Sequence, residues 1–168
     1  MMVESHVGSG MEDLQPVDRE KICPLLLRVF CSNIRHNPVQ EYYRGNVPGN
    51  ELQIYTWMDC SLRELMGLIK EVNQEARRPG TEFQFAIVRP VDDSPYGGGG
   101  RGGYGGGGGY EMREIGSTIS GQRGVDDQKT LQGCKFTIGD FVDVAVIPSG
   151  AIGPGGPRVG GPPRGRRY

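Results

Sequence analysis

The sequence predicts an α+β fold in which a mixed sheet of five strands packs against one main helix. Two segments with the two-residue apolar alternation of strands precede the only long helical pattern, and three more follow it. The chain has 168 residues, a length typical of one domain with tails. Packing the single apolar stripe of the helix on one face of the sheet buries the apolar side of every element.

The two strands before the helix are predicted at 23–31 and 51–56, because apolar and other residues alternate there with the period of a half-buried strand. The residues on their inward faces are Leu25, Leu27, Val29, Leu52 and Ile54. The residues on their outward faces are Leu26, Arg28, Phe30, Gln53 and Tyr55. Each strand can therefore contribute one face to a core under the helix.

The main helix is predicted at 62–76, where apolar residues recur at offsets of three and four. These residues are Leu62, Leu65, Met66, Ile69, Val72 and Ala76. Ser61 and Glu64 form a capping-box pattern at its start, with Asp59 as an alternative cap. Pro79 and Gly80 end the helical pattern, because proline cannot continue the hydrogen-bond ladder.

The strands after the helix are predicted at 83–87, 110–119 and 141–147, with a short helical turn at 129–131 before the last. The resulting order β-β-α-β-β-β is that of the β-grasp, or ubiquitin-like, arrangement. A ferredoxin-like sandwich is the rival fold, but it requires a second long helix before the last strand. Residues 121–139 contain four glycines and no helical stripe, which disfavours that rival.

The domain is predicted at 17–147, with a disordered Gly-rich insertion at 97–109. Residues 1–16 form a flexible acidic arm, and residues 148–168 form a disordered tail rich in Pro, Gly and Arg. The tail carries four arginines and no acidic residue, so the two ends of the chain have opposite charge. We expect 97–109 to act as a flexible linker whose deletion leaves folding intact.

Composition argues against several classes of protein. A net charge of −1 argues against a protein that coats nucleic acid, and a mean hydropathy of −0.45 argues against an integral membrane protein. No secretory signal opens the chain, so we expect an intracellular protein. The four cysteines and two histidines show no zinc-ligand spacing, and we expect neither a metal nor a cofactor.

Catalysis is not expected either. Cys60 at the helix start could hold a thiolate, but its only plausible base within the domain is His36, which lies in a different loop. The acidic pairs at 92–93 and 126–127 lie beside proline or glycine, where solvated turn residues are expected.

Several contiguous runs resemble the family of Sin-three-associated polypeptides of about eighteen kilodaltons. The matching runs are DREK (18–21), CPLLLRVF (23–30), RGNVP (44–48), ELQIYTW (51–57), the helix 62–76, REIGST (113–118) and KFTIGD (135–140). The resemblance covers about 17–147 apart from the glycine tract, and extends to the Arg-rich tail ending in Tyr. The departure is the glycine insertion, which is longer than the family's connection at that hairpin.

The resemblance implies a non-enzymatic nuclear adaptor of a ubiquitin-like family. Its members join the Sin-three histone deacetylase corepressor complex. They also form a ternary complex with the scaffold Acinus or Pinin and a serine-rich-domain RNA-binding protein, which accompanies the exon junction and modulates mRNA splicing. The implied location is the nucleus, including nuclear speckles, with a cytoplasmic fraction as a further possibility. RNA contact would then be indirect.

The sheet face that the helix leaves uncovered is the predicted docking site for a scaffold peptide, because large apolar residues gather there. The site comprises Leu26, Phe30, Tyr55 and Trp57, flanked by Tyr42, Tyr43 and Arg44. The alternative is that the long loop at 32–50 folds over this face and buries it internally.

Two other functions fit parts of the sequence less well. Direct RNA binding through the glycine tract and the Arg-rich tail would give steeply salt-dependent RNA affinity, although the tract has one Arg and the tail only four. A conjugating ubiquitin-like modifier needs an exposed Gly-Gly terminus, whereas Arg, Pro and a terminal Tyr168 follow both Gly-Gly pairs. Both are disfavoured relative to the adaptor.

Overall fold

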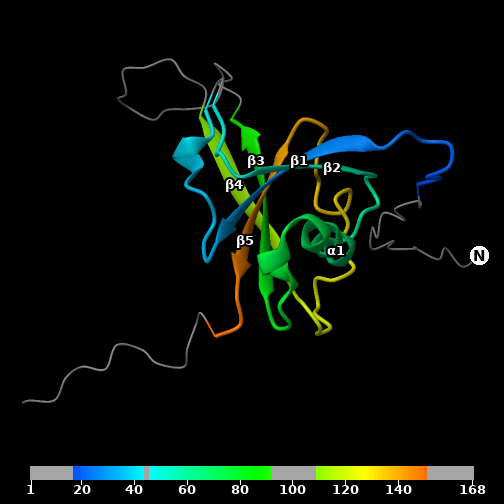
Figure 1. Cartoon of the computed structure of the whole chain (residues 1–168). Helices are drawn as coiled ribbons and strands as arrows, with labels where there is room; N and C mark the ends of the chain where they lie inside the picture. The colour runs from blue at the N-terminus through cyan, green and yellow to red at the C-terminus, as the bar shows by residue number, and fades with distance from the viewer. Residues whose placement is uncertain (1–16, 44–45, 92–108, 151–168) are drawn as a thin grey trace, which may run out of the picture.

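The computed structural model describes residues 17–43, 46–91 and 109–150, which form a five-stranded sheet with one α-helix on one of its faces (Figure 1). The acidic arm, the glycine insertion apart from Gly109, Arg44 and nearly all of the Arg-rich tail lie outside the described residues. Within the described residues, no helix is long and apolar enough to cross a membrane.

The elements follow the predicted order. They are β1 (Leu25–Asn33), η1 (Val39–Glu41), β2 (Glu51–Thr56), α1 (Leu62–Val72), η2 (Gln74–Arg77), β3 (Glu82–Pro90), β4 (Tyr110–Ile119) and β5 (Phe141–Ile147). The sheet order is β2-β1-β5-β3-β4, with β1 and β5 parallel and every other neighbouring pair antiparallel. This mixed sheet around one helix confirms the predicted α+β, ubiquitin-like β-grasp fold.

Several elements differ from the prediction: β1 spans Leu25–Asn33 where 23–31 was predicted, and β3 spans Glu82–Pro90 where 83–87 was predicted. The first strand begins at Leu25, after Pro24, because proline cannot donate to a strand ladder. The helix ends at Val72 because Asn73 adopts extended backbone angles, and its side chain accepts a hydrogen bond from the Glu75 N–H to open the 3-10 turn η2. Thr130 forms an isolated bridge with Ser61 where a helical turn was predicted.

The main core lies between α1 and one face of the sheet. Ser61 caps the helix as predicted, since its hydroxyl accepts a hydrogen bond from the Glu64 N–H at 3.1 Å. The buried helix residues are Leu62, Leu65, Met66 and Ile69. They pack against the inward side chains of β1, β3 and β5, which include Leu27, Val29, Phe83, Phe85, Val142 and Val144. Val72, predicted to belong to the stripe, is instead exposed at the last turn.

A second, smaller core lies on the opposite face of the sheet. Phe30, Tyr42 and Val88 are buried together there, with Val47, Tyr110, Met112 and Phe141 packed around them. The connection between β1 and β2 covers this part of the face, and its short helix η1 lies beside β4 in Figure 1. This face, which we call the back face, therefore has a covered part and an open part.

Candidate partner-binding surface

The covered part of the back face is closed by aromatic packing. Tyr42 meets the Phe30 ring edge-on, with ring centroids 5.3 Å apart, and stacks on Phe141 at 5.8 Å. Tyr110, at the start of β4, also stacks on Phe141 at 6.2 Å and lies 6.4 Å from the Tyr42 ring. Phe30 and Tyr42 are consequently 0% and 2% exposed, so no partner can reach them in this conformation.

A buried carboxylate, Asp143 on β5, ties the covering connection to the sheet. Its oxygens accept hydrogen bonds from the Asn37 side chain at 2.7 Å, the Asn37 backbone N–H at 3.2 Å and the Tyr42 hydroxyl, and lie 2.7 Å from His36 Nδ1. Burial, together with the hydrogen bond to Asp143, raises the pKa of Tyr42 well above its usual range. The Tyr42 hydroxyl therefore stays protonated and donates to the carboxylate.

These contacts correct the predicted exposure of Phe30 and Tyr42. Phe30 does lie on the face opposite the helix, as its position in the strand predicts, but the alternative in which the connection covers that face holds around it. The physical reason is that burial of the aromatic rings of Phe30, Phe141 and Tyr110 stabilises the packed connection. Asp143 anchors this connection to β5 through its hydrogen bonds.

The open part of the back face lies at the β2 end of the sheet. Leu26 on β1 and Tyr55 on β2 are directly opposed cross-strand partners, and 42% of Leu26 and 66% of Tyr55 is exposed. Tyr43 is also exposed, but it follows Tyr42 and so lies on the β4 side of the face. The structure thus brings Leu26 and Tyr55 together and separates Tyr43 from them, while Arg44 lies outside the described residues.

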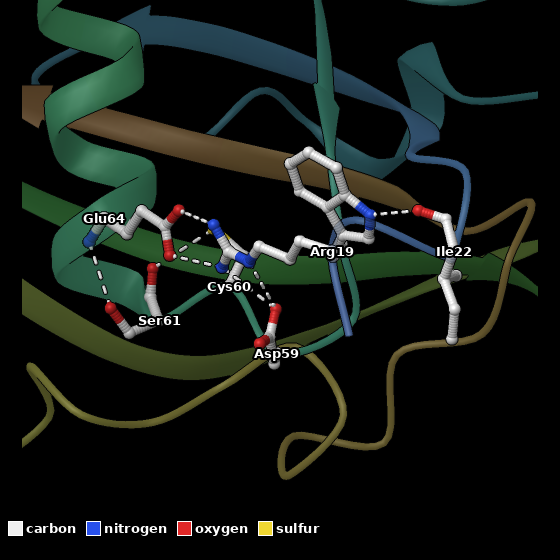
Figure 2. Close-up of polar contacts among 7 residues, drawn as sticks. Arg19, Ile22, Asp59, Cys60, Ser61 and Glu64 are labelled. Atoms are coloured by element: carbon white, nitrogen blue, oxygen red, sulfur yellow. Dashed lines mark hydrogen bonds and ion pairs between the residues drawn. The ribbon is translucent and has the colours of Figure 1, made fainter. Parts of the chain in front are cut away.

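Trp57, the seventh predicted residue, is half-buried next to the segment that enters the domain. Its indole N–H donates to the Ile22 carbonyl at 2.7 Å, and the Arg19 guanidinium lies over its ring at 5.0 Å. Figure 2 shows Arg19 reaching between Asp59 and Glu64, to which it forms ion pairs of 2.9 and 2.7 Å. We call residues 18–23, held down in this way, the strap.

The strap borders an apolar groove of about 560 Å³. The lining residues include Ile22, Leu25, Trp57, Met58 and Ile138, and Ile22 and Ile138 are largely exposed. Sequence reasoning assigned 17–23 to the domain but did not foresee this groove. Arg19 gives no sequence signal for its role, because its two carboxylate partners are 40 and 45 residues away.

The described residues hold no arrangement suited to catalysis by Cys60 and His36. Cys60 is fully buried in the main core, its Sγ donates to the Ser61 carbonyl, and burial raises its pKa to about 11. His36 instead meets Asp143 on the other face of the sheet. No group of three or more metal-ligating side chains occurs among residues 17–43, 46–91 and 109–150.

Comparison with known proteins gives consistent similarities. The family model described as Sin3 associated polypeptide p18 (SAP18) matches residues 16–146. A human protein named histone deacetylase complex subunit SAP18 is 49% identical over 170 residues, covering 99% of this chain and 97% of its own length. The Drosophila melanogaster protein of that name is 47% identical, with coverages of 90% and 93%. A probable subunit of that name from Caenorhabditis elegans is 56% identical, covering 80% of this chain and 76% of its own length.

Proposed function

The chain belongs to the Sin3 associated polypeptide p18 (SAP18) family, and from this premise we propose that it is a non-enzymatic adaptor subunit of a histone deacetylase corepressor complex. The family match and the names of its relatives support this role. The rigid β-grasp domain suits an adaptor, because it can hold binding surfaces on more than one side of a sheet.

We propose further that the adaptor docks a peptide of a larger scaffold protein on the open part of the back face. The observation that carries this step is the exposed pair of Leu26 and Tyr55, which face each other across β1 and β2. A large aromatic beside an aliphatic residue supplies contact area at low entropy cost, as interface hot spots do. Trp57 and the apolar groove bordered by the strap extend the apolar surface at this end of the molecule.

The scaffold in this proposal is Acinus or Pinin, bound together with a serine-rich-domain RNA-binding protein. Through it the adaptor links transcriptional corepression with the exon-junction-associated complex that modulates mRNA splicing. Its site of action is the nucleus, including nuclear speckles, and a cytoplasmic pool is compatible with the same role. The support for these partners is the resemblance of the runs 23–30, 51–57 and 135–140 to the family.

The test is to purify tagged full-length chain from nuclear extract and quantify the deacetylase-complex and splicing-complex proteins that accompany it. Leu26→Ser combined with Tyr55→Ser should reduce scaffold recovery about tenfold or more, since it removes the central apolar contact. Val125→Ser is the matched control, because Val125 is 99% exposed and lies outside this surface. An intact fold with unchanged recovery in the double variant would reject the docking surface.

The same preparation separates the adaptor from a direct RNA binder. An adaptor should bind RNA weakly in isolation and acquire RNA only with its partners. RNA affinity of the isolated chain that falls steeply as salt is raised would instead support binding through the glycine tract and the Arg-rich tail.

A further inference from the structure

The two edge strands of the sheet, β2 and β4, differ in how far their outward backbone groups are available for pairing, and those of β4 are protected. The Ser117 N–H of β4 donates to the Asp126 carboxylate at 3.0 Å, and the Ile115 carbonyl accepts from Lys129 Nζ at 3.1 Å. The β3–β4 pairing also shifts register opposite Phe85 and Ala86. Gly116 permits the close approach of Asp126, because a Cβ at this glycine would lie 3.0 Å from the Asp126 side chain. These are devices that keep an edge strand from pairing with other chains.

The register of β2 shows which of its backbone groups face outward. The Cys31 N–H donates to the Asn50 carbonyl at 3.2 Å, and the same register continues through the β1–β2 ladder. Hydrogen-bonded pairs alternate along an antiparallel ladder. Every second residue after Asn50 therefore bonds to β1, and the residues between them direct their N–H and C=O groups to the free edge. These outward residues are Glu51, Gln53 and Tyr55.

The β2 edge lacks the protection that β4 has. Among the described residues, no hydrogen bond reaches the outward backbone groups of Glu51, Gln53 or Tyr55, and no strand lies beyond β2. The β1–β2 register has no bulge, and β2 contains neither Pro nor Lys. A regular edge of this kind, without a bulge, Pro or Lys, is a template for an added strand.

Apolar surface flanks this edge on both faces of the sheet. On the helix side, a hollow of about 410 Å³ is lined by Leu52, by the exposed Val72 at the end of α1, and by Glu75. On the back face, the exposed ring of Tyr55 stands beside the edge. The carboxylate of Glu51 is neutralised by Arg28, whereas Glu75 has no ion-pair partner among the described residues, and no basic residue lines the hollow.

We propose that β2 pairs with an extended segment of a partner protein, which adds a sixth strand to the sheet. The segment carries an aliphatic side chain for the hollow of Leu52 and Val72, a Lys or Arg for Glu75, and an apolar residue against Tyr55. The outward amides and carbonyls supply affinity, and the side chains on the two faces supply selectivity. This inference rests on the proposed docking function and specifies how the scaffold peptide binds.

The experiment compares Gln53→Pro with Gln53→Ala in the full chain. Proline removes the outward N–H but no ladder bond to β1, because the Gln53 N–H points away from β1, and edge strands tolerate such a proline. Alanine removes the side chain and keeps the N–H. The probes are overlapping synthetic peptides that tile the subunits co-purifying with the wild-type chain. The tightest peptide is then also made with N-methyl groups on alternate residues, in both registers, which blocks strand pairing and preserves the side chains.

Strand addition predicts that Gln53→Pro and one N-methylated register each weaken peptide binding about tenfold or more, while Gln53→Ala and the other register do not. The N-methyl result holds even if Gln53→Pro impairs folding. Binding insensitive to both modifications would overturn the inference, as would the absence of any binding peptide. A dimer that forms through β2 and is broken by Gln53→Pro would overturn it in favour of a second copy of the chain.

These results are distinguishable from a failure of the docking surface. If the Leu26 and Tyr55 double variant loses the scaffold while Gln53→Pro retains it, docking stands and strand addition falls. If Gln53→Pro loses the peptide and the double variant retains it, the edge is the binding element and the side-chain surface is not. If both variants retain it, both proposals fall.

Discussion

The covered and open parts of the back face begin from the same strand. Leu26 and Phe30 lie on the same side of β1, four residues apart, yet Leu26 is 42% exposed and Phe30 is fully buried. The difference comes from the β1–β2 connection, which brings Tyr42 over Phe30 and is anchored by Asp143. Exposure of a strand residue is thus decided by which loop reaches it, and alternation alone cannot separate a second core from a binding surface.

The largest expected effect is a difference in the free energy of unfolding between variants of Phe30 and Leu26. Phe30→Ala should lower the free energy of unfolding by about 3–5 kcal/mol, because it leaves a cavity among Tyr42, Val88 and Phe141. Leu26→Ala should lower it by less than about 1 kcal/mol, since much of the side chain is already in water. Chemical denaturation of both variants checks the contrast, and equal losses would show that the two parts are covered alike.

A smaller loss is expected when the anchor is weakened without a change of shape. Tyr42→Phe removes the hydroxyl that donates to the buried Asp143 carboxylate and keeps the ring packing. The free energy of unfolding should fall by about 1–3 kcal/mol, the usual range when a buried polar group loses its partner. Faster amide exchange in 36–43 should accompany the loss. Unchanged exchange there would mean that ring packing alone holds the connection.

The next effect is a dependence of stability on pH. The change in the free energy of unfolding should be smaller than the losses expected for Phe30→Ala and Tyr42→Phe. Arg19 holds the pKa of Glu64 below its usual value, chiefly through their hydrogen bond. The contact therefore stabilises the fold fully at pH values above the unfolded pKa of Glu64, which is about 4.3. This stabilisation is lost as the pH falls through the lower pKa of the folded state. Both side chains are about a third exposed, so solvent screening limits the effect to about 1 kcal/mol or less. Arg19→Ala should therefore lose less stability than wild type between neutral and acidic pH in thermal melts. An equal loss of thermal stability in both proteins would show that the Arg19–Glu64 contact does not contribute to the pH dependence.

The open part should be the most tolerant of change. Tyr55→Ser should alter the free energy of unfolding by about 0.5 kcal/mol or less, because most of the ring lies in water. Scaffold binding should fall nonetheless, so stability and binding separate at this residue. A large loss of stability would place Tyr55 in a structural role instead.

The smallest effect is expected from removal of the glycine tract. Tyr110 follows the tract and packs in the covered part, so deleting 97–109 tests whether that packing depends on the insertion. We expect an unchanged melting temperature, since closure cost varies slowly with loop length. A fall of several degrees would link the tract to the covered part of the back face.

Much of the fold could be predicted because each element carries a local signal. β2, β4 and β5 have the bounds that their alternation predicts, and Ser61 caps the helix as its capping box predicts. The signals that misled were also local. Val72 fits the helical stripe, yet the helix ends there and leaves it exposed.

The site was less predictable because its features depend on contacts between distant residues. Asp143 lies 107 residues from His36, and Arg19 lies 45 residues from Glu64. Asp143 did carry an unused signal, since a charged residue within the apolar run of β5 must find hydrogen-bond partners when the strand is central. Identifying the free backbone groups of β2 requires knowing that β2 lies at the edge of the sheet. Apolar alternation along the sequence does not specify the strand order.

The central position of β5 has a consequence for synthesis of the chain. β1 and β3 each gain their second neighbour only when β5 inserts between them, so the middle of the sheet joins the first and last strands of the described residues. A nascent or truncated chain that stops before residue 141 leaves one edge of β1 and one edge of β3 unpaired, and it lacks the core residues Val142, Val144 and Val146. Completion of the sheet must therefore wait until β5 has been translated, and products that terminate before it should be substrates for chaperones and proteases.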